Sequence, residues 1–388
     1  MRFHVAGVGS LGSLVAHHLR KATSATHPIL LLYDKRKHAL HGPDALHVEK
    51  FGSVVTTAGF ERETYTANEE PIDSLFLTTR ANATIHAIKQ LAPRLSANST
   101  VVLVQNGLAV YDRIIETLFR NPNQRPHFIF ASTTHVALFQ AAGDLPGNLH
   151  KLVYPRRRGI LEFAIVPDPF GRNFEAGFAD AKLHPSERNP RLSDLGNPEE
   201  DSYQRYRSLR NTVAALLLAD ALNARWKPME HLQLILRRKL AVNSVIHPLT
   251  ALLGCPTADI FATPGSVRIA NKICQEASAV FGAQIREQAK AWIDAGQGQV
   301  GGVLGIARLP PALEAQSLVK QCLQISTDSK GTISSMLDAV RKGRATEIEF
   351  LNGYLMKVGK TYGVETPTIQ IMYDMMKMRS TVPLDQIP

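Results

Sequence analysis

The sequence of 388 residues has few of the features that mark secreted, metal-bound or membrane proteins. Its three cysteines, Cys255, Cys274 and Cys322, form neither a CxxC pair nor a spacing typical of metal ligands. So sparse and odd a set favours buried thiols in a reducing compartment over a disulfide framework. The longest apolar stretch, 213–222, is interrupted by Asp220, and no run reaches the roughly 18 residues that suggest a membrane-spanning helix. We therefore expect no metal site and no membrane partner.

We expect no cleaved targeting signal at the N-terminus, because a strand-like segment begins at Arg2. We expect a cytoplasmic protein, with a mitochondrial location as the alternative. The formal net charge of +10 is compatible with an anionic ligand or a nucleic-acid partner. We favour a solvated basic surface, which makes a nucleic-acid partner the weaker interpretation. A monomer and a homodimer both remain open.

Strand and helix signals alternate over the first 135 residues. The apolar runs and the helical segments between them are, in order, 3–6, 11–21, 29–34, 74–79, 82–95, 100–105 and 111–119. This alternation is typical of a parallel sheet covered by helices. Further strand-like runs follow at 128–139, 160–166 and 224–227. The stretch 168–202 is rich in Pro, Asn, Asp, Arg and Gly, which predicts a long and mobile surface insertion.

After a boundary that we place near Pro228, nearly every segment has helical periodicity. The helical segments are 229–252, 266–295, 311–325 and 346–362, with Pro and Gly between them. We predict an α/β Rossmann N-terminal domain, residues 1–228 with the insertion at about 168–202, for dinucleotide binding. An all-α C-terminal domain, residues 229–388, would carry the substrate and the catalytic residues.

A glycine-rich motif stands at the extreme N-terminus. It consists of Gly7, Val8, Gly9, Ser10, Leu11 and Gly12 and matches GxGxxG. The motif follows an apolar strand and opens an apolar-periodic helix, which is the context that dinucleotide binding requires. Gly7 permits the tight turn, Gly9 lets the backbone approach a pyrophosphate, and Gly12 lets the helix pack closely on the strand. The N–H groups at the start of the helix would then bind the anion.

The end of the second predicted strand carries conflicting signals about the cofactor. Asp34 lies about 20 residues past the last glycine, where an acidic residue binds the ribose 2′-hydroxyl of NAD. Lys35, Arg36 and Lys37 follow directly and suit a 2′-phosphate instead. We favour NADPH over NADH, because three cations at one loop tip outweigh one carboxylate. Ordinary loop charges are the alternative explanation for these cations.

Three further stretches are distinctive. They read "VVLVQNGLAVYDRI", "RRKLAVNSVIHPLTALLGCP" and "SSMLDAVRKGRATEIEFLNGYLMKVGKTYGVETPT". Together with the glycine motif, and in this order, they resemble the ketopantoate reductase family. The resemblance is weakest between about 135 and 225, where the chain is longer than compact members of that family. It implies a Rossmann domain joined to a helical domain, with the active site in the cleft between them.

The resemblance also implies roles for single residues. Lys239 matches the catalytic lysine, which donates a proton to the carbonyl oxygen of the substrate. Glu347, in the TEI motif, matches a glutamate that orients substrate and lysine. Asn243 and Ser335 match residues that bind the substrate, the serine at its carboxylate. Asn106, in the QNG turn, matches an asparagine near both nicotinamide and substrate.

Two positions depart from the family pattern. His247 stands where the family usually has an asparagine that contacts the substrate, and histidine is bulkier and able to charge. Arg80 stands where the family usually has a lysine near the cofactor, and the geometries of the two cations differ. These departures bear on which 2-oxo acid is bound more than on the type of reaction.

Elementary chemistry points to the same lysine. Delivery of a hydride to a ketone builds negative charge on oxygen, which a nearby ammonium both stabilises and protonates. Burial lowers the pKa of such an ammonium and makes it a better acid near neutrality. A spacing of four residues places Lys239, Asn243 and His247 along one face of a helix. The alternatives are a polar stripe that faces solvent and a purely structural pair between Lys239 and Glu347.

The resemblance thus implies an NADPH-dependent 2-dehydropantoate 2-reductase, which would form (R)-pantoate on the route to pantothenate. The first alternative is a reductase of another branched 2-oxo acid, which His247 would favour. The second alternative is a catalytically inactive, basic scaffold or RNA-binding protein, which the net charge and the long insertion would favour.

Overall fold

The computed structural model covers the whole chain, and the residues whose structure is described here fall into nine ranges. They are residues 1–34, 45–50, 52–105, 107–135, 138–141, 150–154, 159–294, 308–329 and 331–381. Lys35, Arg36 and Asn106, which the sequence assigns to the cofactor or substrate, lie outside these described residues. The chain forms two compact units, Met1–Gln233 and Leu234–Pro388.

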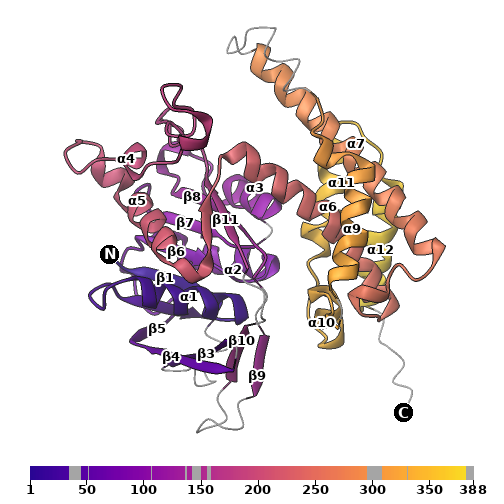
Figure 1. Ribbon diagram of the computed structural model, residues 1–388, viewed down its shortest axis with the longest axis horizontal. Coiled ribbons are helices and arrows are strands. Elements are labelled where there is room, and N and C mark those ends of the chain that lie inside the picture. Colours follow the sequence, from indigo (N-terminus) through magenta and orange to yellow (C-terminus); the bar gives the residue numbers. More distant parts are fainter. Residues whose placement is uncertain are drawn as a thin grey trace. The chain divides into compact units, whose positions relative to one another are not determined.

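Among the described residues, the main sheet of the N-terminal unit has eight strands (Figure 1). In spatial order they are β12 (Ala224–Trp226), β11 (Leu161–Ile165), β8 (His127–Thr133), β7 (Thr100–Leu103), β6 (Ser74–Leu77), β1 (Phe3–Ala6), β2 (Ile29–Tyr33) and β5 (Phe60–Thr64). Neighbouring strands are parallel except β8 and β11, which run antiparallel. The chain leaves β1 for β2 on one side and later returns to β6 on the other. The carboxyl ends of β1 and β6 therefore mark the point where ligands bind in open sheets of this type.

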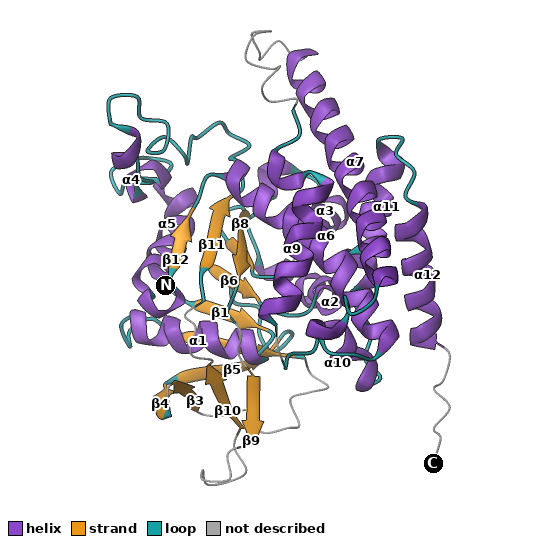
Figure 2. Cartoon of the chain, turned by 45° about the vertical axis from the view of Figure 1, so that its right-hand side comes forward, coloured by secondary structure: helices purple, strands orange, loops and turns teal. Residues whose placement is uncertain are grey.

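Helices cover both faces of this sheet (Figure 2). They are α1 (Ser10–Ala22), α2 (Ala81–Leu91), α3 (Gly107–Thr117) and α5 (Tyr203–Leu218). Helices α1 and α5 contact each other, as do α2 and α3. Because both faces are covered, the central strands are apolar along their whole length: FHVA in β1, SLFL in β6 and TVVL in β7 are buried at every position.

A second, smaller sheet packs on the outer side of α1. It contains β4 (Ser53–Ala58), β3 (Ala45–Lys50), β10 (His150–Tyr154) and β9 (Leu138–Ala141), in that order. Leu14 of α1 packs against Val48 and Leu152 of this sheet, and the His17 ring hydrogen-bonds the Thr57 hydroxyl over 2.9 Å. The sequence did not predict this sheet. The single strand expected over 128–139 is wrong, because β8 ends at Thr133 and β9 belongs to the second sheet.

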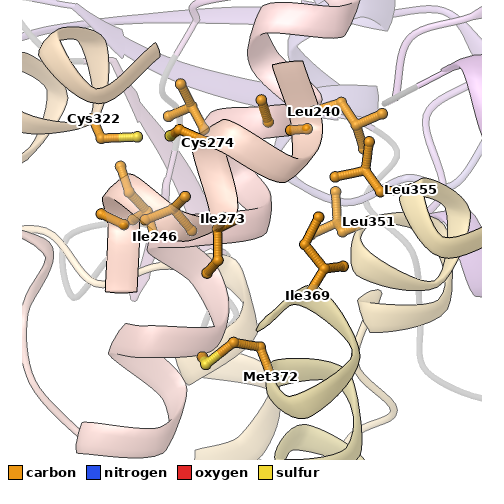
Figure 3. Packing of buried hydrophobic residues seen from close by; sticks show 14 of the residues in the cluster. Leu240, Ile246, Ile273, Cys274, Cys322, Leu351, Leu355, Ile369 and Met372 are labelled. Carbon is orange, nitrogen blue, oxygen red and sulfur yellow. The ribbon is translucent and has the colours of Figure 1, made fainter. Parts of the chain in front are cut away.

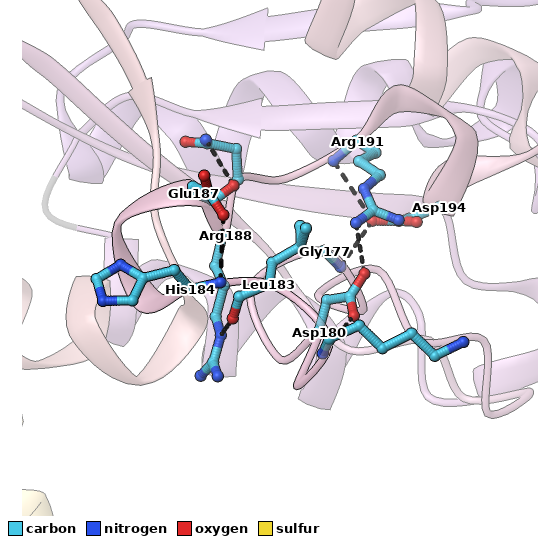
Figure 4. A network of polar contacts seen from close by, with 10 residues as sticks. Gly177, Asp180, Leu183, His184, Glu187, Arg188, Arg191 and Asp194 are labelled. Carbon is cyan, nitrogen blue, oxygen red and sulfur yellow. Dashed lines mark hydrogen bonds and ion pairs between the residues drawn. The ribbon is translucent and has the colours of Figure 1, made fainter.

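The stretch 168–202 has little regular structure, as its composition indicates. Its short helix α4 (Leu192–Leu195) and its turns are held by local polar contacts, such as that between Arg191 and Asp180 (Figure 4). Phe174 and Leu195 are buried in the core of the unit, and this packing fastens the stretch to α5 and the sheet. Its mobility stays a prediction.

The C-terminal unit contains helices and no strand among its described residues. The helices are α6 (Met229–Leu253), α7 (Pro264–Asp294), α9 (Ala315–Asp328), α10 (Ser335–Arg341), α11 (Asn352–Thr361) and α12 (Pro367–Thr381), with 3-10 turns at Thr257–Asp259, Pro311–Leu313 and Ile348–Phe350. The fold class predicted from the sequence is confirmed. One boundary is not: the helix expected over 346–362 is divided, because the backbone at Leu351 (φ −110°, ψ −93°) departs from helical values before α11 begins.

The core of this unit surrounds the middle of α6. Leu240 and Ile246 of α6 pack with Ile273 of α7 and with Leu351 and Leu355 at the start of α11 (Figure 3). The α6 sequence is apolar on several sides, which is typical of a helix buried within a bundle. Polar side chains on such a helix require partners, which makes those of α6 informative.

Candidate functional site

The glycine motif forms the turn between β1 and α1. Gly7 has φ +96°, which favours glycine, and a Cβ there would lie 2.5 Å from the Thr79 methyl group. A Cβ on Gly12 would overlap the carbonyl oxygen of Gly7, so α1 lies directly on the turn. Gly9 is different, because a Cβ there would meet nothing within 4 Å. The open space beside Gly9 lies at the N-terminus of α1, whose first turn carries no acidic residue.

The turns after β6 and β7 lie beside this glycine turn. The Thr78 hydroxyl donates to the Gly7 carbonyl over 2.8 Å. The Thr79 and Thr84 hydroxyls are 2.7 Å apart, and the Gln105 amide donates to Thr84 over 3.2 Å. Three loops at the carboxyl ends of β1, β6 and β7 are thereby joined. Gln105 directly precedes Asn106, so the QNG turn starts within this group.

Arg80 begins α2 at the same edge of the sheet. Its carbonyl accepts hydrogen bonds from the backbone N–H groups of Ala83 and Thr84, both over 2.9 Å, and its side chain is partly buried. Asp34 follows β2, and its carboxylate lies 3.8 Å from the imidazole of His86 on α2. The acidic residue and the arginine considered for the cofactor are thus both at the edge that carries the glycine turn.

Lys239, Asn243 and His247 all lie in α6, each four residues after the last, as the sequence predicts. All three side chains are partly buried. Their neighbours Leu240 and Ile246 belong to the core of the unit. The stripe is therefore set into an apolar surface, which disfavours its interpretation as an ordinary solvent-facing stripe.

Burial lowers the pKa of the Lys239 ammonium, and the nearby carboxylate of Glu347 opposes this effect. The two influences act in opposite directions on one amine: desolvation favours loss of its proton, whereas the negative charge retains it. The structure therefore places Glu347 within electrostatic reach of Lys239, although the two residues are 108 positions apart in the sequence. The TEI segment therefore lies near the part of α6 that carries Lys239.

His247 is neutral at physiological pH. Burial and the positive charge of Lys239 lower its pKa from 6.5 to about 4. A neutral imidazole carries one N–H donor and one acceptor nitrogen. Within the described part of the chain, its buried Nδ1 atom has no hydrogen-bond partner. The ring therefore adds hydrogen-bonding capacity, and no charge, to the region around Lys239.

Ser335 is the first residue of α10, and its side chain is exposed. The preceding serine, Ser334, is buried and caps the helix: its hydroxyl accepts from the Leu337 N–H over 3.1 Å. The same hydroxyl lies 2.6 Å from that of Thr250 on α6. A buried polar contact therefore ties the segment that presents Ser335 to α6.

Sequence reasoning overlooked the residues that tie these segments to α6. Besides Ser334 and Thr250, they include Asn352, whose side-chain amide donates to the Ser244 carbonyl over 3.2 Å. Pro248 was the sequence feature that could have indicated such a contact. A proline inside a helix cannot donate to the carbonyl four residues earlier, so that carbonyl needs another donor.

Among the residues with described placement, no group of three His, Cys, Asp or Glu side chains could hold a metal ion. Within the same residues, no helix has the length and the apolar character needed to cross a membrane.

Comparison with known families assigns both ends of the chain to the same one. Residues 3–150 match the model described as "Ketopantoate reductase PanE/ApbA". Residues 231–380 match the model described as "Ketopantoate reductase PanE/ApbA C terminal". The two matched ranges include the glycine turn and the lysine stripe of α6.

Relatives and solved structures extend this result. The chain is 24% identical to the 2-dehydropantoate 2-reductase of Vibrio cholerae, over 97% of each chain. It is 23% identical to the probable 2-dehydropantoate 2-reductase of Schizosaccharomyces pombe, over 97% of this chain and 95% of the relative. A structure of 2-dehydropantoate 2-reductase from Geobacter metallireducens superposes with TM-score 0.64 and 17% identity, over 97% and 99% of the two chains. A D-mandelate dehydrogenase in complex with NADH and anilino(oxo)acetate gives TM-score 0.64 and 18% identity, over 98% of each chain.

Proposed function

The chain belongs to the ketopantoate reductase family, and we propose that it reduces 2-dehydropantoate to (R)-pantoate with NADPH, a step towards pantothenate. The observation that carries this proposal is the environment of Lys239. Its ammonium is partly buried in an apolar surface, with a lowered pKa and a carboxylate, Glu347, close by. This is the environment that a general acid needs in order to work near neutral pH.

Lys239 would supply the proton of the reaction. A bound nicotinamide dinucleotide would supply a hydride to the ketone carbon. As negative charge grows on the ketone oxygen, the Lys239 ammonium stabilises it and transfers one proton from Nζ to that oxygen. The product is a hydroxyl group, and the neutral amine regains a proton from water. Glu347 keeps the amine protonated between turnovers, because its charge raises the pKa that burial lowers.

The glycine turn supports a dinucleotide. The space beside Gly9 lets a pyrophosphate approach the backbone, and a side chain there would fill that space. The N-terminus of α1 adds backbone donors and the positive end of the helix dipole. Gly7, Val8, Gly9, Ser10, Leu11 and Gly12, together with Arg80, Lys35, Arg36 and Asn106, are the residues that we assign to the cofactor. The preference for NADPH rests on the three consecutive cations Lys35, Arg36 and Lys37.

The other polar residues of the C-terminal unit would hold the 2-oxo acid. Asn243 stands one turn after Lys239 on α6, and His247 one turn further. Asn243 and the neutral His247 would hydrogen-bond the uncharged part of the substrate. The exposed Ser335 hydroxyl would donate to the substrate carboxylate, and Asn106 would contact the substrate near the nicotinamide.

A direct assay tests the proposal. The purified chain is mixed with 2-dehydropantoate and either NADPH or NADH, and the absorbance of the reduced dinucleotide is followed. We expect oxidation that is faster with NADPH. Turnover only with other branched 2-oxo acids would transfer the proposal to them, an outcome that His247 favours. If no 2-oxo acid is reduced and the protein binds RNA in a salt-sensitive manner, the inactive basic scaffold replaces the enzyme.

A further inference from the structure

Pro248 interrupts the backbone hydrogen bonding inside α6. The helix continues through this residue from Met229 to Leu253. A proline has no backbone N–H, so the carbonyl of Ser244, four residues earlier, loses its helical partner. This carbonyl lies on a buried part of the helix, where an unpaired acceptor is costly. Its replacement donor is the side-chain amide of Asn352, over 3.2 Å.

Asn352 is the first residue of α11 and is fully buried. It lies five residues after Glu347. The short 3-10 turn between them closes with a hydrogen bond of 2.9 Å from the Phe350 N–H to the Glu347 carbonyl. A side chain fixed at one end of so short a segment restricts the position of the other end.

We propose that Asn352 is a positioning residue, which holds the Glu347 segment against α6 through the carbonyl that Pro248 leaves free. The role rests on the proposed function, because Glu347 matters to Lys239 only if the amine acts as an acid. Asn352 would act on Glu347 indirectly. Its effect passes through the backbone between residues 347 and 352.

The opposite side of the same segment is held differently. Glu349 is exposed and accepts hydrogen bonds from the Tyr373 hydroxyl over 2.7 Å and from the Lys377 amine over 2.9 Å. Exposed pairs of this kind restrain a chain weakly. The bond from Asn352 is buried, and its acceptor lies in the helix that carries Lys239. It is therefore a buried contact that helps to set the distance between the carboxylate and the amine.

A pair of substitutions separates positioning from stability. Asn352→Leu leaves the Ser244 carbonyl without a donor and should lower the melting temperature by about 2–4 °C. Pro248→Ala restores a backbone N–H to that carbonyl, so the double variant should regain most of this loss. Activity should not return in the double variant, because the side-chain contact of residue 352 with α6 is still missing. If Asn352→Leu fails to fold, Asn352→Ala takes its place.

Two readouts report the position of Glu347. In Asn352→Leu, the titration midpoint of Lys239, followed by amine modification and peptide mass analysis, should fall because the opposing carboxylate moves away. The kcat with the 2-oxo acid should fall on the order of tenfold or more, with a smaller change in KM. Ser326→Ala is the matched control, since it removes a buried hydrogen bond to the Thr257 carbonyl (2.9 Å) in the same unit. It should lower the melting temperature and leave the Lys239 titration and kcat unchanged.

The outcomes are distinct. A lowered Lys239 midpoint in Asn352→Leu, against no change in Ser326→Ala, supports positioning. An Asn352→Leu variant that loses stability like the control, and keeps the wild-type Lys239 titration, overturns it. If the wild-type chain reduces no 2-oxo acid, the proposed function fails, whereas the titration of Lys239 still decides the role of Asn352.

Discussion

Gly9 and Gly12 of the β1–α1 turn should respond differently to substitution by alanine. Gly9 has φ −88° and open space around its Cα, so Gly9→Ala fits the fold. A poorer helix cap and a less flexible unfolded chain then nearly cancel, which leaves the free energy of unfolding within about 0.5 kcal/mol of wild type. Gly12→Ala forces a methyl group into the Gly7 carbonyl and should cost about 1–3 kcal/mol.

For cofactor binding we expect Gly9→Ala, which hardly changes the stability, to have a large effect. The methyl group of Gly9→Ala would occupy the space where we place the pyrophosphate, and the Kd for NADPH should rise on the order of tenfold to a hundredfold, or about 1.4–2.8 kcal/mol. Urea unfolding gives the stability, and fluorescence titration of NADPH gives the Kd. A stable Gly9→Ala variant that binds NADPH as tightly as wild type would refute the placement of the dinucleotide on this turn.

Two further predictions concern stability and substrate binding. Burial and the charge of Arg94 lower the pKa of His4 from 6.5 to about 4, so the unfolded chain binds the extra proton and stability is lost as the pH falls from 6.5 towards 4. Between pH 7 and pH 5 this group should account for about 2 kcal/mol, and urea unfolding of His4→Leu should show a pH dependence weaker by that amount; equal slopes would contradict it. Ser334→Ala removes the cap of α10 and the contact with Thr250, which should cost about 1–2 kcal/mol. It should also raise the KM of the 2-oxo acid, because Ser335 is displaced. An unchanged KM would show that Ser334 does not position Ser335 for substrate binding.

The sequence predicted the parts of the fold that local patterns determine. The continuous apolar strands β1, β6 and β7 and the glycine motif between β1 and α1 are such patterns, because a covered parallel sheet requires them. Lys239 and Asn243 are four residues apart, so any helix brings them onto one face. These features depend on neighbours within a few residues.

Features that depend on distant pairing were not predictable in the same way. In the second sheet, β3 pairs with β10 about a hundred residues later, and no local pattern indicates which strand is the partner. The break before α11 lies at Leu351, and Ile348, Phe350 and Leu351 around it are all buried, for which the sequence offers no local signal. The composition of 168–202 indicated irregular structure but could not indicate that Phe174 and Leu195 anchor it.

The site shows the same division. Pro248 indicates that the Ser244 carbonyl needs a donor from outside the helix. No nearby residue indicates that this donor is Asn352, which lies 108 residues from Ser244. The nearness of Glu347 to Lys239 came from the family resemblance, since charge pairing across such a distance has no local signal. The neutral state of His247 required the burial and the adjacent ammonium that only the folded helix provides.

The central claim is that the amine of Lys239 supplies the proton for reduction of a 2-oxo acid. Its most direct test is the kcat of Lys239→Ala with saturating NADPH and 2-dehydropantoate, beside a melting experiment that shows NADPH still binds. We expect kcat to fall by about a hundredfold to ten-thousandfold while NADPH still raises the melting temperature. A kcat within about threefold of wild type would contradict general-acid catalysis by this residue.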